Sequence, residues 1–136
     1  MKDNLISQVM YIVIHCSDDK FKLHNAFDIH KLHLSLGWDG IGYHKVIKRN
    51  GVIEQGRPEF WIGAHVYGHN KNSLGICLIG KDKFTKNQFL SLKKLIIKWK
   101  KKYPKAEILG HSNFNNTKKT CPNFDVKSWL KKTGIA

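Results

Sequence analysis

The chain has 136 residues, of which 41% are hydrophobic, enough for one compact domain with a core of its own. No stretch approaches the roughly 20 consecutive apolar residues of a membrane span. The N-terminal segment lacks the apolar core of a secretory signal. We therefore expect a monomer that is made in the cytoplasm and that would need release or another export route to act outside it.

The basic charge of the chain is concentrated in its second half. The net charge is +14. Residues 1–80 contain nine basic and seven acidic residues, a net charge of +2, whereas residues 81–136 contain fifteen basic and three acidic residues, a net charge of +12. Such an excess favours a polyanionic partner, which could be nucleic acid, an anionic membrane or the polymers of a cell envelope. No helix-turn-helix, zinc-finger or aromatic stacking motif is recognisable, so a stable nucleic-acid complex is not expected.

Four segments in the first part of the chain have strand or helix patterns. Val9–His15 is a run of β-branched and aromatic residues, which predicts a buried strand. Asn25–Leu36 contains neither Gly nor Pro and predicts a helix. Residues 43–54 predict a hairpin because Asn50-Gly51 suits a tight turn, and Leu74–Ile79 predicts another strand.

The second part of the chain contains the clearest helix. Lys86–Tyr103 repeats large apolar residues at spacings of three and four, and Thr85 with Gln88 forms a capping box before it. The lysines on its other faces form either a solvated surface or a binding face for a polyanion. A short strand at Glu107–Leu109 and a helix from Val126 follow. Interleaved strands and helices predict an α/β fold, with a central mixed sheet and helices packed on its faces, as a single domain over residues 1–136.

Three side chains have the chemistry of a catalytic zinc site. His15 ends the first strand, His111 follows the strand at Glu107–Leu109, and Cys121 lies ten residues further on. Two imidazoles and one thiolate leave a fourth tetrahedral position for water. The spacing alone is a weak pattern, and it leaves open that His15 is a buried core histidine.

The other histidines and cysteines have simpler explanations. We expect His24, His30 and His33 at the surface, because no carboxylate or cysteine accompanies them. Cys16 should point to the opposite face of the strand from His15, since side chains alternate. Cys77 alternates with apolar residues in its strand and is expected in the core. The odd count of three cysteines argues against a disulfide framework.

Seven short blocks follow one another between about residues 11 and 130. They are VIHCS (13–17), GYHKVI (42–47), GVIEQGR (51–57), GAH (63–65), NSLGICLIG (72–80), GH (110–111) and KTCPNFD (119–125). Together they resemble the type-2 N-acetylmuramoyl-L-alanine amidases, which include small bacteriophage endolysins and animal peptidoglycan recognition proteins. The compact chain is most similar to the single-domain phage endolysins.

The resemblance implies a function and a set of site residues. The implied reaction is zinc-dependent hydrolysis of the amide between N-acetylmuramic acid and L-alanine in bacterial peptidoglycan. His15, His111 and Cys121 match the ligands of one Zn²⁺ per chain, and Tyr43 and Lys119 match catalytic positions. His65 matches a pocket histidine that contacts the glycan or the peptide, or else supports the structure.

Two alternatives remain at this stage. One is a module that binds peptidoglycan without cutting it, although such relatives typically lack the cysteine found here at Cys121. The other is an amidase with a second role, because some phage members also regulate their phage's RNA polymerase; the sequence has no motif for this partner. In either case the expected place of action is the cell wall, where the basic surface would attract anionic envelope polymers.

Overall fold

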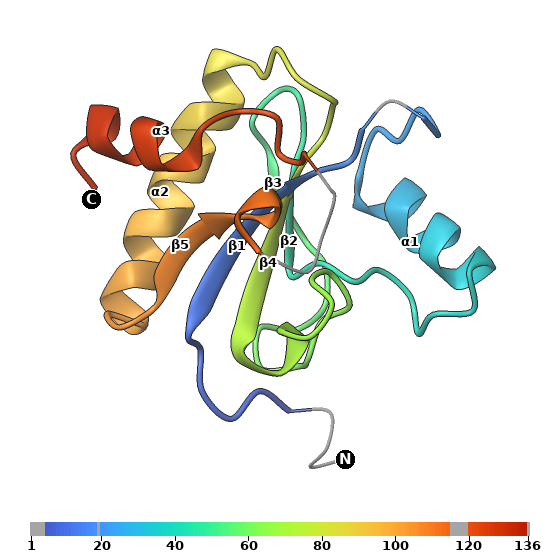
Figure 1. Ribbon diagram of the computed structural model, residues 1–136. Helices are drawn as coiled ribbons and strands as arrows, with labels where there is room; N and C mark the ends of the chain where they lie inside the picture. The colour runs from blue at the N-terminus through green and yellow to red at the C-terminus, as the bar shows by residue number, and fades with distance from the viewer. Residues whose placement is uncertain (1–4, 19, 115–119, 136) are drawn as a thin grey trace.

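The computed structural model describes residues 5–18, 20–114 and 120–135. At its centre lies a five-stranded sheet in the order β3-β2-β4-β1-β5 (Figure 1). The strands are β1 Tyr11–Cys16, β2 Lys45–Ile47, β3 Ile53–Gln55, β4 Ser73–Leu78 and β5 Glu107–Gly110. β3 is antiparallel to β2, whereas all the other pairings are parallel. The sheet is therefore mixed, as the sequence predicts.

The two central strands are buried on both faces. All six residues of β4 are buried, as are five of the six in β1, which explains their almost continuous apolar sequences. β1 pairs with β4 on one side and with β5 on the other. The predicted hairpin is confirmed: β2 and β3 pair through a turn in which Gly51 has φ +88, a value that favours glycine.

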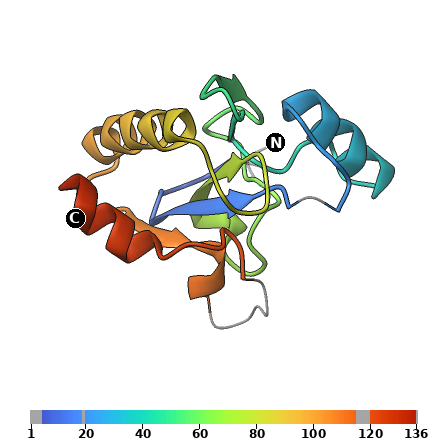
Figure 2. The ribbon, with the colours of Figure 1, turned by 90° about the horizontal axis from the view of Figure 1, so that it is seen from above.

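Helices cover both faces of the sheet. They are α1 Ala26–Ser35, α2 Lys86–Lys102 and α3 Val126–Thr133, with short 3₁₀ turns η2 Asn70–Asn72 and η3 His111–Asn113. α2 and α3 lie on one side of the sheet and α1 lies on the other (Figures 1 and 2). Within the described residues, no helix is both long and apolar enough to cross a membrane.

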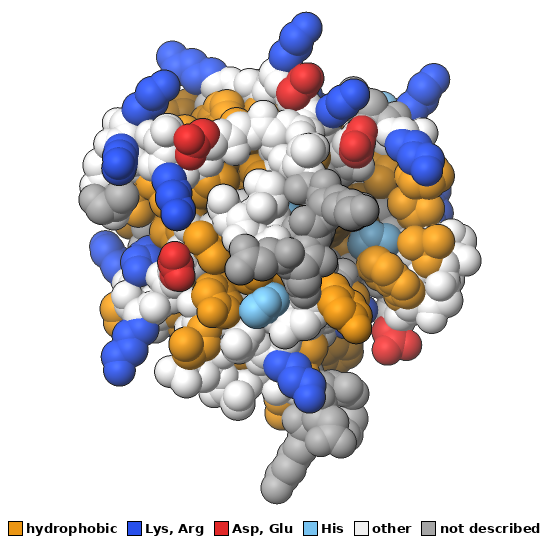
Figure 3. All heavy atoms as spheres, viewed as in Figure 1, with side chains coloured by type: hydrophobic (Ala, Val, Ile, Leu, Met, Phe, Trp, Pro, Cys, Tyr) orange, Lys and Arg blue, Asp and Glu red, His pale blue; other side chains and the backbone are white. Residues whose placement is uncertain are grey.

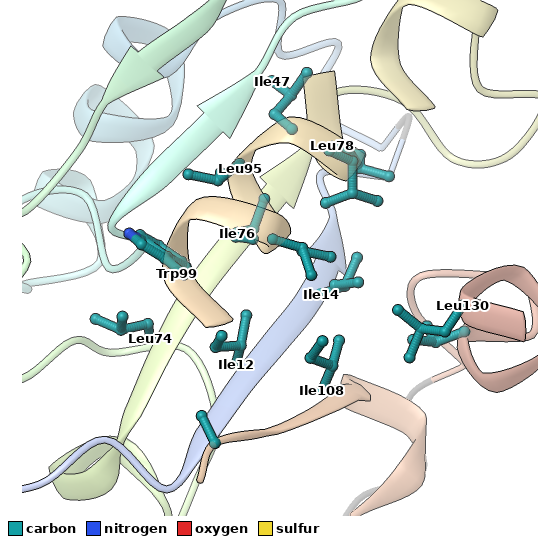
Figure 4. Packing of buried hydrophobic residues seen from close by; sticks show 14 of the residues in the cluster. Ile12, Ile14, Ile47, Leu74, Ile76, Leu78, Leu95, Trp99, Ile108 and Leu130 are labelled. Carbon is teal, nitrogen blue, oxygen red and sulfur yellow. The ribbon is translucent and has the colours of Figure 1, made fainter. Parts of the chain in front are cut away.

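The larger core lies between the sheet and α2. Ile12, Ile14 and Ile76 from the strands face Trp99 from the helix (Figure 4), and these four side chains are at most 1% exposed, as is Ile96 of the same cluster. Each such side chain contributes about 1.5–3 kcal/mol when fully buried. The helical face predicted from the sequence is thus confirmed as the contact with the sheet.

The start of α2 is fixed by the predicted capping box. The Thr85 side chain accepts a hydrogen bond from the Gln88 N–H, and the Gln88 side chain accepts one from the Thr85 N–H. The Gln88 amide also donates to the carbonyl oxygens of Ile47 and Ile79, at 3.2 and 2.9 Å. One buried side chain therefore starts the helix and joins it to the sheet.

α1 forms where it is predicted, but one of the histidines expected at the surface lies on its buried face. Asn25 caps it, and its buried side chains are Ile29 and His33, one helical turn apart. Phe27, in contrast, is 65% exposed. The expectation that His33 lies at the surface is therefore wrong: a position four residues after Ile29 falls on the face that packs against the sheet.

Candidate metal centre

The carboxyl ends of two neighbouring parallel strands bring the first two candidate ligands together. His15 is the penultimate residue of β1, and His111 follows the last residue of β5 directly. Their ring centroids are 4.7 Å apart. Parallel strands commonly present functional groups at this edge of a sheet.

A loop near the end of the chain brings the third candidate ligand to the same place. The backbone N–H of Cys16 donates to the sulfur of Cys121 at 2.7 Å, and the Ser112 N–H donates to the Cys121 carbonyl at 2.9 Å. One ligand atom from each of His15, His111 and Cys121 lies within 4.8 Å of the other two. The three residues singled out in the sequence are thus neighbours in space.

This donor set fits a zinc ion. In a tetrahedral site with bonds of about 2.0–2.3 Å, ligand atoms lie about 3.4–3.8 Å apart, so a closure of about 1 Å would suffice. The Cys16 N–H is already directed at the Cys121 sulfur, where it would stabilise a thiolate. Cys16 is not a member of the ligand group, although its side chain lies near that of Cys121.

The three residues line a pocket of about 540 Å³. Aromatic side chains line it too, among them Trp38, which is 40% exposed, and Tyr67, which is 85% exposed. Figure 3 shows histidine side chains near the middle of this face among hydrophobic ones, with Lys and Arg mostly around its edge. The pocket combines a few polar side chains with apolar and aromatic ones, as ligand sites usually do.

Tyr43 lies in this pocket beside the candidate ligands. Its ring centroid is 5.1 Å from that of His15. Burial raises the pKa of its phenol well above the usual value, and neighbouring Cys77 and Cys121 raise it further. The phenol therefore stays protonated at neutral pH and can donate a hydrogen bond.

His65 lies behind His15. Its Nδ1 is 2.9 Å from His15 Nε2, and its Nε2 is 3.2 Å from the hydroxyl of Ser73. Burial lowers the pKa of His65 well below its usual value, and nearby His44 and His111 lower it further, so the imidazole is neutral. Although His65 lines the pocket, it is 9% exposed, and its two ring nitrogens face His15 and Ser73.

Two further buried histidines support the pocket. His33 Nδ1 accepts the Gly42 N–H at 2.9 Å, and its ring packs against that of Trp38 in a tilted arrangement, with centroids 4.3 Å apart. His44 Nδ1 accepts the Gly75 N–H at 3.0 Å. Burial lowers the pKa of each to about 4. Sequence reasoning missed the role of His33, and its spacing from Ile29 was the signal that could have revealed it.

Lys119, which the resemblance implies to be catalytic, lies outside the described residues, and its position relative to Cys121 stays a prediction. The pKa of the Cys121 thiol is raised by the nearby Cys16 side chain and by burial, and the Cys16 N–H opposes this shift. Without a cation the sulfur is therefore a thiol, and a metal would have to displace its proton.

With this geometry in view, comparison with known proteins identifies the family. Residues 6–124 match the family described as N-acetylmuramoyl-L-alanine amidase. The chain belongs to this family. It is 38% identical over 133 residues to the endolysin of Escherichia phage T7, covering 91% of this chain and 87% of that protein.

Solved structures of amidases and their relatives have the same fold. The N-acetylmuramoyl-L-alanine amidase LysC from Clostridium intestinale URNW superposes with a TM-score of 0.84 at 30% identity, covering 95% of this chain and 87% of that one. A mutant of Drosophila PGRP-LB in complex with tracheal cytotoxin gives a TM-score of 0.75 at 29% identity, with 88% and 78% covered. The expected fold and enzyme class, an N-acetylmuramoyl-L-alanine amidase of endolysin type, are confirmed.

Proposed function

We propose that this chain is a single-domain, zinc-dependent endolysin that hydrolyses the amide between N-acetylmuramic acid and L-alanine in peptidoglycan. The observation that carries the proposal is the convergence of His15, His111 and Cys121 in one pocket, with ligand atoms within 4.8 Å of one another. The similarity to the endolysin of phage T7 over nearly the whole chain supports a wall-degrading role.

The side chains of the site suit the hydrolysis of an amide. A bound zinc would supply Lewis acidity towards the amide carbonyl and towards an attacking water. The Tyr43 phenol, protonated at neutral pH, would donate a hydrogen bond to the developing oxyanion or pass a proton to the leaving amine. We assign Lys119 the role of a cation that stabilises the oxyanion, by family resemblance alone.

The pocket and the surface around it suit a wall polymer. Exposed Trp38 and Tyr67 offer flat apolar surfaces for a sugar ring or a peptide. The complex of Drosophila PGRP-LB with tracheal cytotoxin supports a peptidoglycan substrate. The basic second half of the chain would hold the enzyme near anionic envelope polymers.

Zinc content and amide cleavage, measured on the same samples, test the proposal. We expect one zinc per chain, with release of amino groups from purified peptidoglycan. Cys121→Ser and His111→Ala should lose both the zinc and the cleavage. His24→Ala, which changes an exposed histidine outside the pocket, is the matched control and should keep both.

Two outcomes would contradict the proposal. The metal site would be ruled out if the wild-type protein cleaved peptidoglycan without bound zinc and Cys121→Ser cleaved it equally well. Binding to peptidoglycan without any release of amino groups would favour the non-catalytic module instead.

A further inference from the structure

We propose that Ser73 and His65 form a hydrogen-bonded relay that sets the tautomer of His15 and so selects its Nδ1 as the metal ligand. The inference rests on the proposed function, because it concerns how this chain prepares the zinc site. Ser73 and His65 would act as positioning residues, through His15, and need not touch the substrate.

The relay begins at the Ser73 hydroxyl, which has one proton to donate. Ser73 Oγ donates it to the carbonyl oxygen of His69 at 2.7 Å. Towards His65 Nε2, at 3.2 Å, the hydroxyl can therefore act only as an acceptor. Ser73 is completely buried, and the His69 carbonyl oxygen, its shorter contact, can only accept, so the hydroxyl proton is assigned to that contact.

The role of Ser73 as an acceptor determines which nitrogen of His65 carries the proton. Since Ser73 accepts, the proton of the neutral His65 ring must lie on Nε2, and Nδ1 must carry a lone pair. That nitrogen is 2.9 Å from His15 Nε2 and can only accept a hydrogen bond from it. His15 therefore carries its proton on Nε2.

The last step assigns the metal-binding atom. A neutral imidazole with its proton on Nε2 has its lone pair on Nδ1, and only a lone pair can bind a metal. We therefore assign Nδ1 of His15 as the nitrogen that would bind a metal together with His111 and Cys121, whose ligand atoms lie within 4.8 Å of that of His15. With the opposite tautomer, a proton on Nδ1 would prevent metal binding until it was lost or moved.

The His65 ring lies close against the sheet. A Cβ atom on Gly75 would lie 2.7 Å from His65 Cγ, so the glycine allows the ring to lie directly against β4. The backbone N–H groups of His65 and Val66 both donate to Asn70 Oδ1 at 2.9 Å, which fixes the main chain beneath the ring. The relay is thus built into the structure before any metal arrives.

A pair of variants at one position separates the relay from simple packing. His65→Leu fills space but offers no acceptor to His15, whereas the carbonyl oxygen of His65→Asn can replace Nδ1. Loss of a hydrogen bond to a metal-binding histidine typically lowers metal affinity 10–100-fold. In competition titrations with a chelator, we expect His65→Leu to weaken zinc binding by about 10–100-fold. His65→Asn should stay within about threefold of the wild type.

The tautomer of His15 can be measured without any variant. In the zinc-free wild-type chain, nitrogen and carbon chemical shifts of the His15 ring should show the proton on Nε2. A proton on Nδ1 would overturn the inference. So would a folded His65→Leu that binds zinc as tightly as the wild type. If His65→Leu does not fold, the ring chemical shifts of the wild type still show which nitrogen of His15 carries the proton.

The inference and the proposed function can fail separately. A wild type that binds no zinc would refute the proposed function, and the ring shifts would still show whether Ser73 and His65 set the tautomer. A wild type that binds zinc and cleaves peptidoglycan, but has its His15 proton on Nδ1, would refute the relay alone.

Discussion

The backbone N–H of Cys16 points at the sulfur of Cys121 from 2.7 Å, across 105 positions of sequence. A donor in this place stabilises a thiolate, whereas burial and the Cys16 side chain keep the pKa of the thiol high until a cation arrives. Zinc binding should therefore expel a proton from Cys121.

This leads to a first prediction, about proton release. Calorimetry in buffers of different ionisation enthalpy should detect about one proton released per zinc bound near pH 7, and the affinity should fall as the pH falls. Cys121→Asp is the matched control, because its carboxylate is already ionised and should release almost none. Equal proton release from both proteins would contradict the assignment of Cys121 as a ligand.

A second prediction separates the chemistry of the site from metal binding. Tyr43→Phe removes a protonated phenol beside His15 but leaves the aromatic ring in place. Because we assign the hydroxyl to the reaction and not to the metal, we expect kcat for amide release to fall about 100-fold or more, with zinc content unchanged. A variant with the wild-type kcat would remove Tyr43 from the catalytic machinery.

A third prediction concerns stability in mild acid. His33 and His44 have pKa values of about 4 in the folded chain against an ordinary value of 6.5, because of burial. Between pH 6.5 and 4 the unfolded chain therefore binds more protons, so the free energy of unfolding falls as the pH is lowered and then levels off. A pKa lowered from 6.5 to about 4 is worth about 3 kcal/mol for each histidine, so the total loss should be roughly 5 kcal/mol, allowing for solvent screening at His33.

Urea unfolding of the zinc-free protein at several pH values would measure this slope. His44→Asn keeps an acceptor for the Gly75 N–H but does not titrate, so its stability should vary less between pH 6.5 and 4. An unchanged slope in this variant would show that His44 does not contribute.

A fourth prediction concerns Gln88, which caps α2 and also donates to two sheet carbonyl groups. Gln88→Leu should lower the free energy of unfolding by about 2–3 kcal/mol, because it leaves buried polar groups without partners. Thr85→Ala loses only the cap and should cost about 1 kcal/mol. Equal losses in urea unfolding would mean that the contacts with the sheet contribute nothing.

Much of the fold follows from local patterns in the sequence. α2 could be predicted because its apolar residues repeat with helical spacing behind a capping box, and β1 because its apolar run is almost continuous. The hairpin was visible in the Asn-Gly pair at its turn. These signals are local, and tertiary packing did not change them.

The site itself could be predicted only in part. His15, His111 and Cys121 could be singled out, but their proximity depends on β5 pairing beside β1, a contact between distant segments. The burial of His33 depends on which face of α1 meets the sheet, and the contact of His65 with His15 depends on the absence of a side chain at Gly75, where the His65 ring lies. Such contacts appear only in three dimensions.

The positions of the three candidate ligands in the chain would give a bound metal a mechanical role as well. A zinc ion held by His15 and Cys121 would act as a cross-link between the first strand and the last loop. In the chain-entropy picture, closing a loop of about 100 residues restricts the unfolded chain by about 4–5 kcal/mol. Loss of the ion would then lower the stability of the folded chain as well as its activity. A chelator should therefore lower the melting temperature together with the rate of amide cleavage.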